Sequence, residues 1–168
     1  MKIEELKQAV DELDKNKAAM TAQLDKFAPT DLLFFFSDKP ELYCIQQQKW
    51  QPILDWAKDI LQTELVVTNS LSVPKNDDLP DALHNMAKKI SSKEFCAWYA
   101  AALNMRSVIL GLALVMGKIT AMQAAELAAL EELWQNEKWG EDELELQKRQ
   151  AKADELKVIE EFCQLCAM

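Results

Sequence analysis

The stretch TAMQAAELAALEELWQNEKWGED, from Thr120 to Asp142, contains the signals that start, pack and end a helix. Thr120 and Gln123 have the spacing of a capping box, in which each side chain satisfies a main-chain N–H group at the helix start. Gly140 is a typical helix stop. At 100° per residue, a narrow apolar stripe of the kind that a half-buried helix requires is formed by Leu127, Leu130 and Trp134. We therefore expect Trp134 to lie in the core.

A second face of this helix is acidic and aromatic. Glu132 and Trp139 are seven residues apart and share one line, with Gln135 close by and Glu131 between that line and the stripe. One interpretation is a solvated acidic helix whose second tryptophan covers the helix end, and composition alone favours it. The other is an acidic rim around an exposed aromatic anchor, where binding energy tends to concentrate.

Size and composition indicate one helical domain. The chain has 168 residues, with 3 glycines and 5 prolines, and it is rich in residues that favour helices. We expect a single domain over residues 1–168. Its fold class should be mostly α, a multi-helix orthogonal bundle with at most a minor two-stranded β element.

Charge and targeting signals narrow the class of partner. A net charge of −9 disfavours nucleic acid and anionic lipid as partners.

The start MKIEELKQAV resembles neither a secretion signal nor a transit peptide, so we expect a bacterial cytoplasmic protein, or alternatively a mitochondrial matrix protein after processing. The apolar stretch 95–117 is interrupted by Asn104, Arg106 and Ser107, and its uninterrupted part is shorter than the roughly 20 residues of a membrane span.

The first half of the chain predicts two long helices around less regular segments. Apolar spacing predicts a helix over 3–27, either a coiled-coil arm or one helix laid on a bundle. The run 31–36 is either a strand or a buried linker. A second short strand is expected at 64–68, paired with the 31–36 run. A second helix should start at a Ser37 or Asp38 cap, with Pro40 in its first turn, and Pro52 should kink or split it near Trp50.

The second half shows clearer boundaries. After a loop at 69–80 and a short helix at 81–90, Ser91 and Glu94 form another capping box. The helix that follows should continue to Met116, stop at Gly117, and approach another backbone at Gly111. A last helix over 141–166 has a polar first half and an apolar second half that should dock.

The chain is poor in groups for catalysis. The single histidine, His84, lies in an amphipathic stretch and reads as a partly exposed helix residue, and no phosphate-binding glycine loop is present. Cys163 and Cys166 form a C-x-x-C that is either two packed cysteines or part of a zinc or redox site. We expect no enzyme, no metal and no cofactor.

Three blocks in order resemble a known family. Leu130 to Glu143, LEELWQNEKWGEDE, closely resembles the signature of the ATP synthase assembly chaperone that binds the α subunit of the soluble catalytic head. QQQKWQPILDWA at 46–57 is similar to that family's W-x-P-x-L-D-W-A segment, and Asp31-Leu32-Leu33 precedes it as in the family. SVILGLALVMGKIT at 107–120 is similar to its apolar helix ending in glycine.

The sequence also departs from the family. Members carry a β-rich N-terminal domain, which we expect to be absent here because only about thirty residues precede the first matching block. Phe35 and Phe36 stand where the family has tyrosine and arginine. Arg106 replaces a small residue, which should alter close helix packing.

The resemblance implies a chaperone without chemistry. Such a protein covers the apolar surface of free α subunit until β arrives, and it is expected to be monomeric when free. By position in the motif, the partner contacts would be Glu131, Glu132, Gln135, Trp139, Glu141 and Asp142. The alternatives are a thiol or zinc-binding protein built on the C-x-x-C, or a coiled-coil adaptor that uses the first helix.

Overall fold

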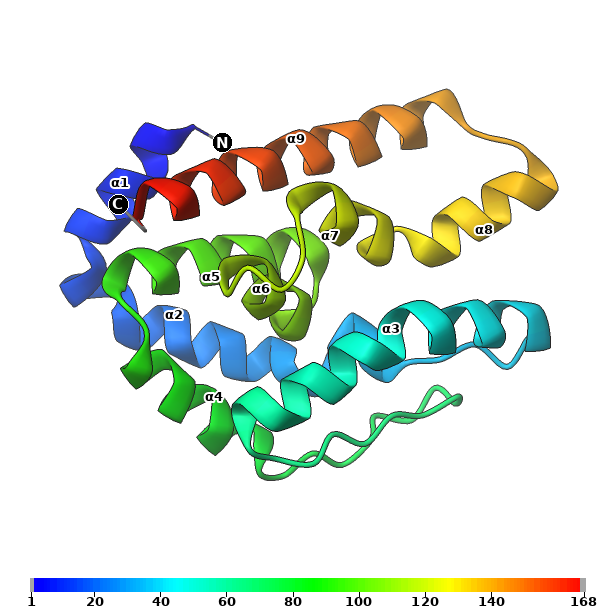
Figure 1. Ribbon diagram of the computed structural model, residues 1–168, viewed down its shortest axis with the longest axis horizontal. Helices are drawn as coiled ribbons and strands as arrows, with labels where there is room; N and C mark the ends of the chain where they lie inside the picture. The colour runs from blue at the N-terminus through cyan, green and yellow to red at the C-terminus, as the bar shows by residue number, and fades with distance from the viewer. Residues whose placement is uncertain (1, 167–168) are drawn as a thin grey trace.

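The computed structural model describes residues 2 to 166, and within them the chain is a bundle of α-helices (Figure 1). Nine α-helices and two short 3-10 helices follow one another in this range. Their bounds are α1 Ile3–Asp11, α2 Leu13–Phe27, η1 Ala28–Thr30, η2 Leu32–Phe34, α3 Pro40–Leu61, α4 Leu79–Lys89, α5 Ser92–Met105, α6 Val108–Val115, α7 Ala121–Ala128, α8 Leu130–Trp139 and α9 Glu143–Cys166. The mostly helical class is confirmed. None of these helices has the length and apolar character needed to cross a membrane.

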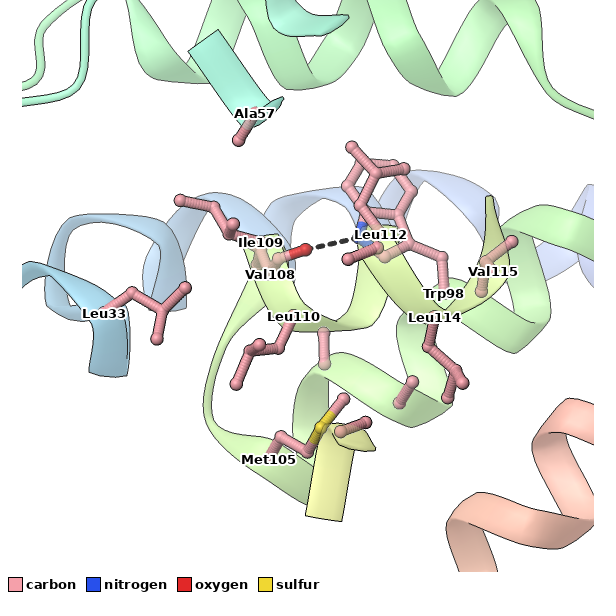
Figure 2. Packing of buried hydrophobic residues seen from close by; sticks show 14 of the residues in the cluster. Leu33, Ala57, Trp98, Met105, Val108, Ile109, Leu110, Leu112, Leu114 and Val115 are labelled. Atoms are coloured by element: carbon pink, nitrogen blue, oxygen red, sulfur yellow. Dashed lines mark hydrogen bonds between the residues drawn. The ribbon is translucent and has the colours of Figure 1, made fainter. Parts of the chain in front are cut away.

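Helices α5 and α6 pack against each other at the centre of the molecule, with α9 on one side and α2 and α3 on the other (Figure 1). Every residue of α6 is buried. A methyl group on Gly111 would lie 2.9 Å from the main-chain nitrogen of Ala102, so the predicted close approach of two backbones is confirmed. Figure 2 shows Trp98 of α5 donating a hydrogen bond from Nε1 to the carbonyl oxygen of Val108, at 2.9 Å.

The prediction of one helix from the Ser91 cap to Met116 is wrong. The capping box is present, but the helix ends at Met105, because Arg106 adopts a left-handed conformation with φ 56°. Ser107 then caps α6 by accepting a hydrogen bond from the Leu110 N–H. A left-handed conformation costs a non-glycine residue about 1 to 2 kcal/mol, so the local sequence does not predict this turn.

Buried Asp31 stabilises that turn from far along the chain. Its Oδ1 accepts from the Leu33 N–H (3.0 Å) and from the Ser107 hydroxyl (2.7 Å), and its Oδ2 accepts from the Ile109 N–H (3.1 Å). Burial outweighs these hydrogen bonds and raises the pKa of Asp31 to about 6. The same carboxylate therefore caps both η2 and α6.

The two possible strands reduce to a single contact. The 31–36 run forms η2, and an isolated bridge between Phe35 and Thr68 is the β-pairing found in the described residues. The Phe36 N–H donates to the Thr68 oxygen, and the Thr68 N–H donates to the Phe34 oxygen, each at 2.8 Å. The strand predicted at 64–68 is therefore wrong beyond this bridge, although the predicted proximity of the two segments is right.

Of the kink or split predicted at Pro52, the split is wrong, because α3 is one helix from Pro40 to Leu61. A proline inside a helix costs about 3 kcal/mol, but α3 buries a long apolar face that offsets this cost. That face consists of Leu42, Trp50, Ile53, Leu54, Ala57 and Leu61. Pro40 opens the helix as expected, whereas the cap position is Lys39 rather than Ser37 or Asp38.

The N-terminal helix lies on the bundle and is not a projecting arm. It is broken at Glu12 into α1 and α2, so the prediction of one continuous helix is wrong. Both parts pack against α5, and α1 also contacts α9. Lys17, at the polar position in the apolar spacing, places its ammonium 5.3 Å from the centre of the Phe95 ring.

The stretch 120–142 forms two helices instead of one. The Thr120 and Gln123 capping box starts α7, and Gly140 ends α8 with φ 90°, both as predicted. Between them Ala129 leaves the helical conformation (φ −99°, ψ 11°). Helix α9 then begins at Glu143 rather than Glu141, and its second half docks through Leu156, Ile159 and Phe162.

Candidate protein-binding surface

Helix α8 lies along the N-terminal part of α3 at one end of the molecule (Figure 1). Leu130 is buried, but Trp134 is only half-buried, so the prediction of a core tryptophan is wrong. Its ring lies between two ammonium groups, with Lys39 at 5.5 Å and Lys138 at 5.0 Å from the ring centre. Trp134 is thus a wall residue at the edge of the core, held by cation–π contacts.

Glu131 and Gln135 lie one turn apart on α8, and both are exposed. Together with Trp134 they form one wall of a groove of about 530 Å³. Residues 35–39 and Leu42 also line it, and Asn69, Ser70 and Leu71 line it from the loop between α3 and α4. We call this the α8–loop groove. Glu131 and Gln135 therefore lie together, as predicted. The sequence did not predict that the loop at 69–71 would line the same groove.

Glu132 of α8 and Glu141, which follows the end of α8, both pair with Arg149. Arg149 of α9 approaches Glu141 to 2.6 Å and Glu132 to 3.5 Å, and the Arg149 side chain is 14% exposed. These ion pairs join α8 to α9 across the turn at Gly140. Both carboxylates therefore pair with an arginine from the polar first half of the last helix.

Trp139 and Asp142 lie at the end of α8 and in the turn that follows it. The indole of Trp139 is 81% exposed, the most exposed aromatic side chain in the described residues. Asp142 is exposed, and its Oδ1 accepts a hydrogen bond from the Leu144 N–H at 3.0 Å. The six predicted contact residues thus fall into three groups. Glu131 and Gln135 line the groove, Glu132 and Glu141 pair with Arg149, and Trp139 and Asp142 are exposed at the end of α8.

Another ion pair joins the end of α8 to α3. Lys138 Nζ lies 2.8 Å from a carboxylate oxygen of Glu41. The hydrogen bond and the positive charge of Lys138 lower the pKa of Glu41. Because Lys138 also contacts Trp134, the one lysine of α8 is already engaged by the protein. The exposed charge left on α8 is acidic.

Two further features that the sequence singled out are His84 and the C-x-x-C. His84 is partly exposed and lies 2.7 Å from Asp25. Across the residues that the structure describes, no group of three or more His, Cys, Asp or Glu side chains could hold a metal ion. Cys163 is half-buried against the core, while the side chain of Cys166 lies outside the described residues.

No family model matches the sequence. Among solved structures, Atp12 from Paracoccus denitrificans matches with a TM-score of 0.86 and 28% sequence identity, over 94% of this chain and 68% of that chain. A mutant of the same protein gives the same values. The Atu1473 protein from Agrobacterium tumefaciens, a candidate chaperone, matches with a TM-score of 0.80 and 28% identity, over 93% of this chain and 59% of that chain.

The sequence blocks that resemble the family lie partly in the core and partly on the surface. Asp31 and Trp50 of the matching blocks are buried, and their hydrogen bonds join segments far apart in the sequence. The block in α8 instead carries exposed residues, including Glu131 and Trp139. The match in fold and sequence to Atp12 supports the resemblance of this chain to the ATP synthase assembly chaperones.

Proposed function

We propose that this chain binds the free α subunit of the ATP synthase catalytic head and covers the surface of α that later meets β. The family supports a role in ATP synthase assembly, and the motif in α8 supports α as the subunit. An apolar surface left open on a free subunit favours aggregation, so a transient cover protects it until the permanent partner binds. The activity is binding and release, without a chemical step.

The exposure of Trp139 is the observation that supports this proposal most. A tryptophan has a large apolar surface, and leaving it in water forgoes about 2 to 3 kcal/mol of burial energy. Tryptophan is also among the residues that dominate binding energy at protein interfaces. An indole that is 81% exposed, beside a row of carboxylates, suits an anchor that a partner buries.

The ion pairs that hold α8 in place favour rapid and selective binding. Arg149 holds α8 to α9, and Lys138 holds it to α3, so the anchor is fixed before the partner arrives. A preorganised surface loses less conformational entropy on association. In this proposal Glu131, Gln135 and Trp139 contact α directly. Glu132, Glu141 and Asp142 form the charged rim, which steers the encounter.

We also propose that residues 1–168 act as one helical domain, equivalent to the part of Atp12 that they match. The domain is monomeric when free, and its binding surface contacts α rather than a second copy of the chain. Its place of action is the bacterial cytoplasm, where the catalytic head is assembled.

Size-exclusion chromatography with light scattering tests the proposal on a mixture of this chain and α subunit from the same source. We expect a one-to-one complex in low salt that weakens as salt is raised. Glu131→Lys should weaken the complex about tenfold, because it reverses a charge at the contact. Glu161→Lys is the matched control, since Glu161 is exposed near the far end of α9. An unchanged complex with Glu131→Lys, or none with the native chain, contradicts the proposal.

A further inference from the structure

The loop between α3 and α4 carries apolar side chains in open solvent. Leu71 is fully exposed (101%), and Val66 and Val73 are each 50% exposed. From Asn69 to Pro74 the loop has no charged residue. Exposed apolar side chains grouped on one projecting segment are typical of a surface that another molecule covers.

This loop is held in place at its base. Asn76 accepts a hydrogen bond from the Val66 N–H (2.7 Å) and donates one to the Val66 oxygen (3.0 Å), so its amide replaces a main-chain partner. The paired hydrogen bonds of Thr68 with residues 34 and 36 fix the loop to the bundle. Closer to the tip, the Ser70 N–H donates to the Thr68 hydroxyl, and the Ser72 N–H donates to the Ser70 hydroxyl. The structure thus presents Leu71 on a braced loop.

The tip of the loop and α8 both line the α8–loop groove. Leu71 lines this groove from the loop, and Glu131 and Gln135 line it from α8. The loop contributes the apolar side chain of Leu71 beside two uncharged polar residues, whereas α8 contributes an exposed carboxylate. Lys39, which also lines the groove, already lies over the Trp134 ring. A segment that fits this groove would have an apolar side chain toward Leu71 and a basic side chain toward Glu131.

We propose that the Leu71 loop is the second arm of the surface that binds the α subunit. The occupant of the α8–loop groove is a segment of α that combines an apolar side chain with a lysine or arginine. Leu71 inserts into the apolar surface of α, and Glu131 pairs with the basic group. This inference rests on the proposed function, because it names the part of the chain that contacts the same partner.

Isothermal titration of α subunit with Leu71→Ser tests the inference. Leu71 is fully exposed, so this change leaves folding intact, which the far-UV circular dichroism and the unfolding midpoint verify. We expect the Kd to rise about tenfold. Met122→Ser is the matched control, because Met122 is 63% exposed on α7 and lies outside the groove; its Kd should stay within about twofold of the native value.

A second measurement separates contact from indirect effects. Amide hydrogen exchange of residues 69–73 should slow when α is bound, and Asn76→Ala should weaken binding by loosening the loop base. Native affinity in Leu71→Ser, with unchanged exchange in the loop, overturns the second arm and leaves the proposed function standing. No complex between the native chain and α overturns both.

Discussion

Trp50 donates a hydrogen bond from Nε1 to the main-chain oxygen of Leu127 over 2.9 Å, and this bond joins the middle of α3 to the end of α7. Trp50 is almost completely buried, and α8 begins three residues beyond Leu127. The tryptophan therefore helps to fix the point from which α8 leaves the core. A residue of the second sequence block thus positions the helix that carries the first.

Trp50→Phe should destabilise the protein by about 2 to 3 kcal/mol, because it leaves the Leu127 oxygen without this donor and opens space in the core. Urea unfolding followed by circular dichroism measures the loss. Trp56→Phe, on the same helix but at a half-buried position, should cost clearly less. Equal losses of unfolding free energy in the two variants would show that the hydrogen bond to Leu127 does not stabilise the protein.

Asp31 should make stability depend on pH. Its pKa is about 6 in the folded protein and near 3.8 when unfolded, so the folded state binds the proton more tightly between these values. Its contribution to stability is therefore largest below about pH 4 and falls as pH rises to about 6, by about 3 kcal/mol.

The variant Asp31→Asn isolates this effect, because its side chain does not titrate. Its oxygen can still accept from Leu33 and Ser107, but its amide faces the Ile109 N–H as a second donor. The native protein should lose more stability than the variant between pH 4 and pH 7 in urea unfolding. Parallel pH profiles would contradict the pKa shift of Asp31.

Gly111→Ala should destabilise the central helix pair more than Gly117→Ala. At position 111 the new methyl group would meet main-chain atoms of Ala102 and Trp98 at 2.9 to 3.2 Å, so α5 and α6 must separate, at a cost of about 2 to 3 kcal/mol. At Gly117 nothing lies within 4 Å, and the cost is about 1 kcal/mol from its φ of 77°. Thermal and urea unfolding compare the two, and the reverse order would contradict this packing.

The two tryptophans of α8 should behave differently when each is replaced by alanine. Trp139→Ala should change the free energy of unfolding by less than about 0.5 kcal/mol, since the indole is mostly in water, but it should weaken binding of α about tenfold or more. Trp134→Ala should cost about 1 to 2 kcal/mol, because it removes a half-buried ring and two cation–π contacts. A large loss of stability in Trp139→Ala would mean that this residue is structural.

Local signals in the sequence predicted several helix boundaries correctly. Capping boxes and helix-ending glycines act within one turn of the chain, so neighbouring residues are enough to predict their effect. This holds for the boxes at Ser91 and Thr120 and for Gly117 and Gly140. The breaks at Arg106 and Ala129 have no such local signal. At Arg106 the turn is stabilised by Asp31, which lies far away in the sequence.

The surface could be predicted only in part. The spacing of Glu131 and Gln135 places them on one face of a helix, and the structure shows both exposed there. The separation of Glu132 from them depends on Arg149, whose position follows from how α9 folds back on α8. The groove itself depends on a loop that reaches α8 only through tertiary structure.

The central claim is that this chain occupies the β-facing surface of the α subunit. Light scattering coupled to size exclusion tests it directly, with the chain fluorescently labelled, bound to α, and then challenged with excess β subunit. We predict that β displaces the label from α and that the free chain elutes as a monomer. A stable complex containing α, β and the labelled chain together would contradict the claim.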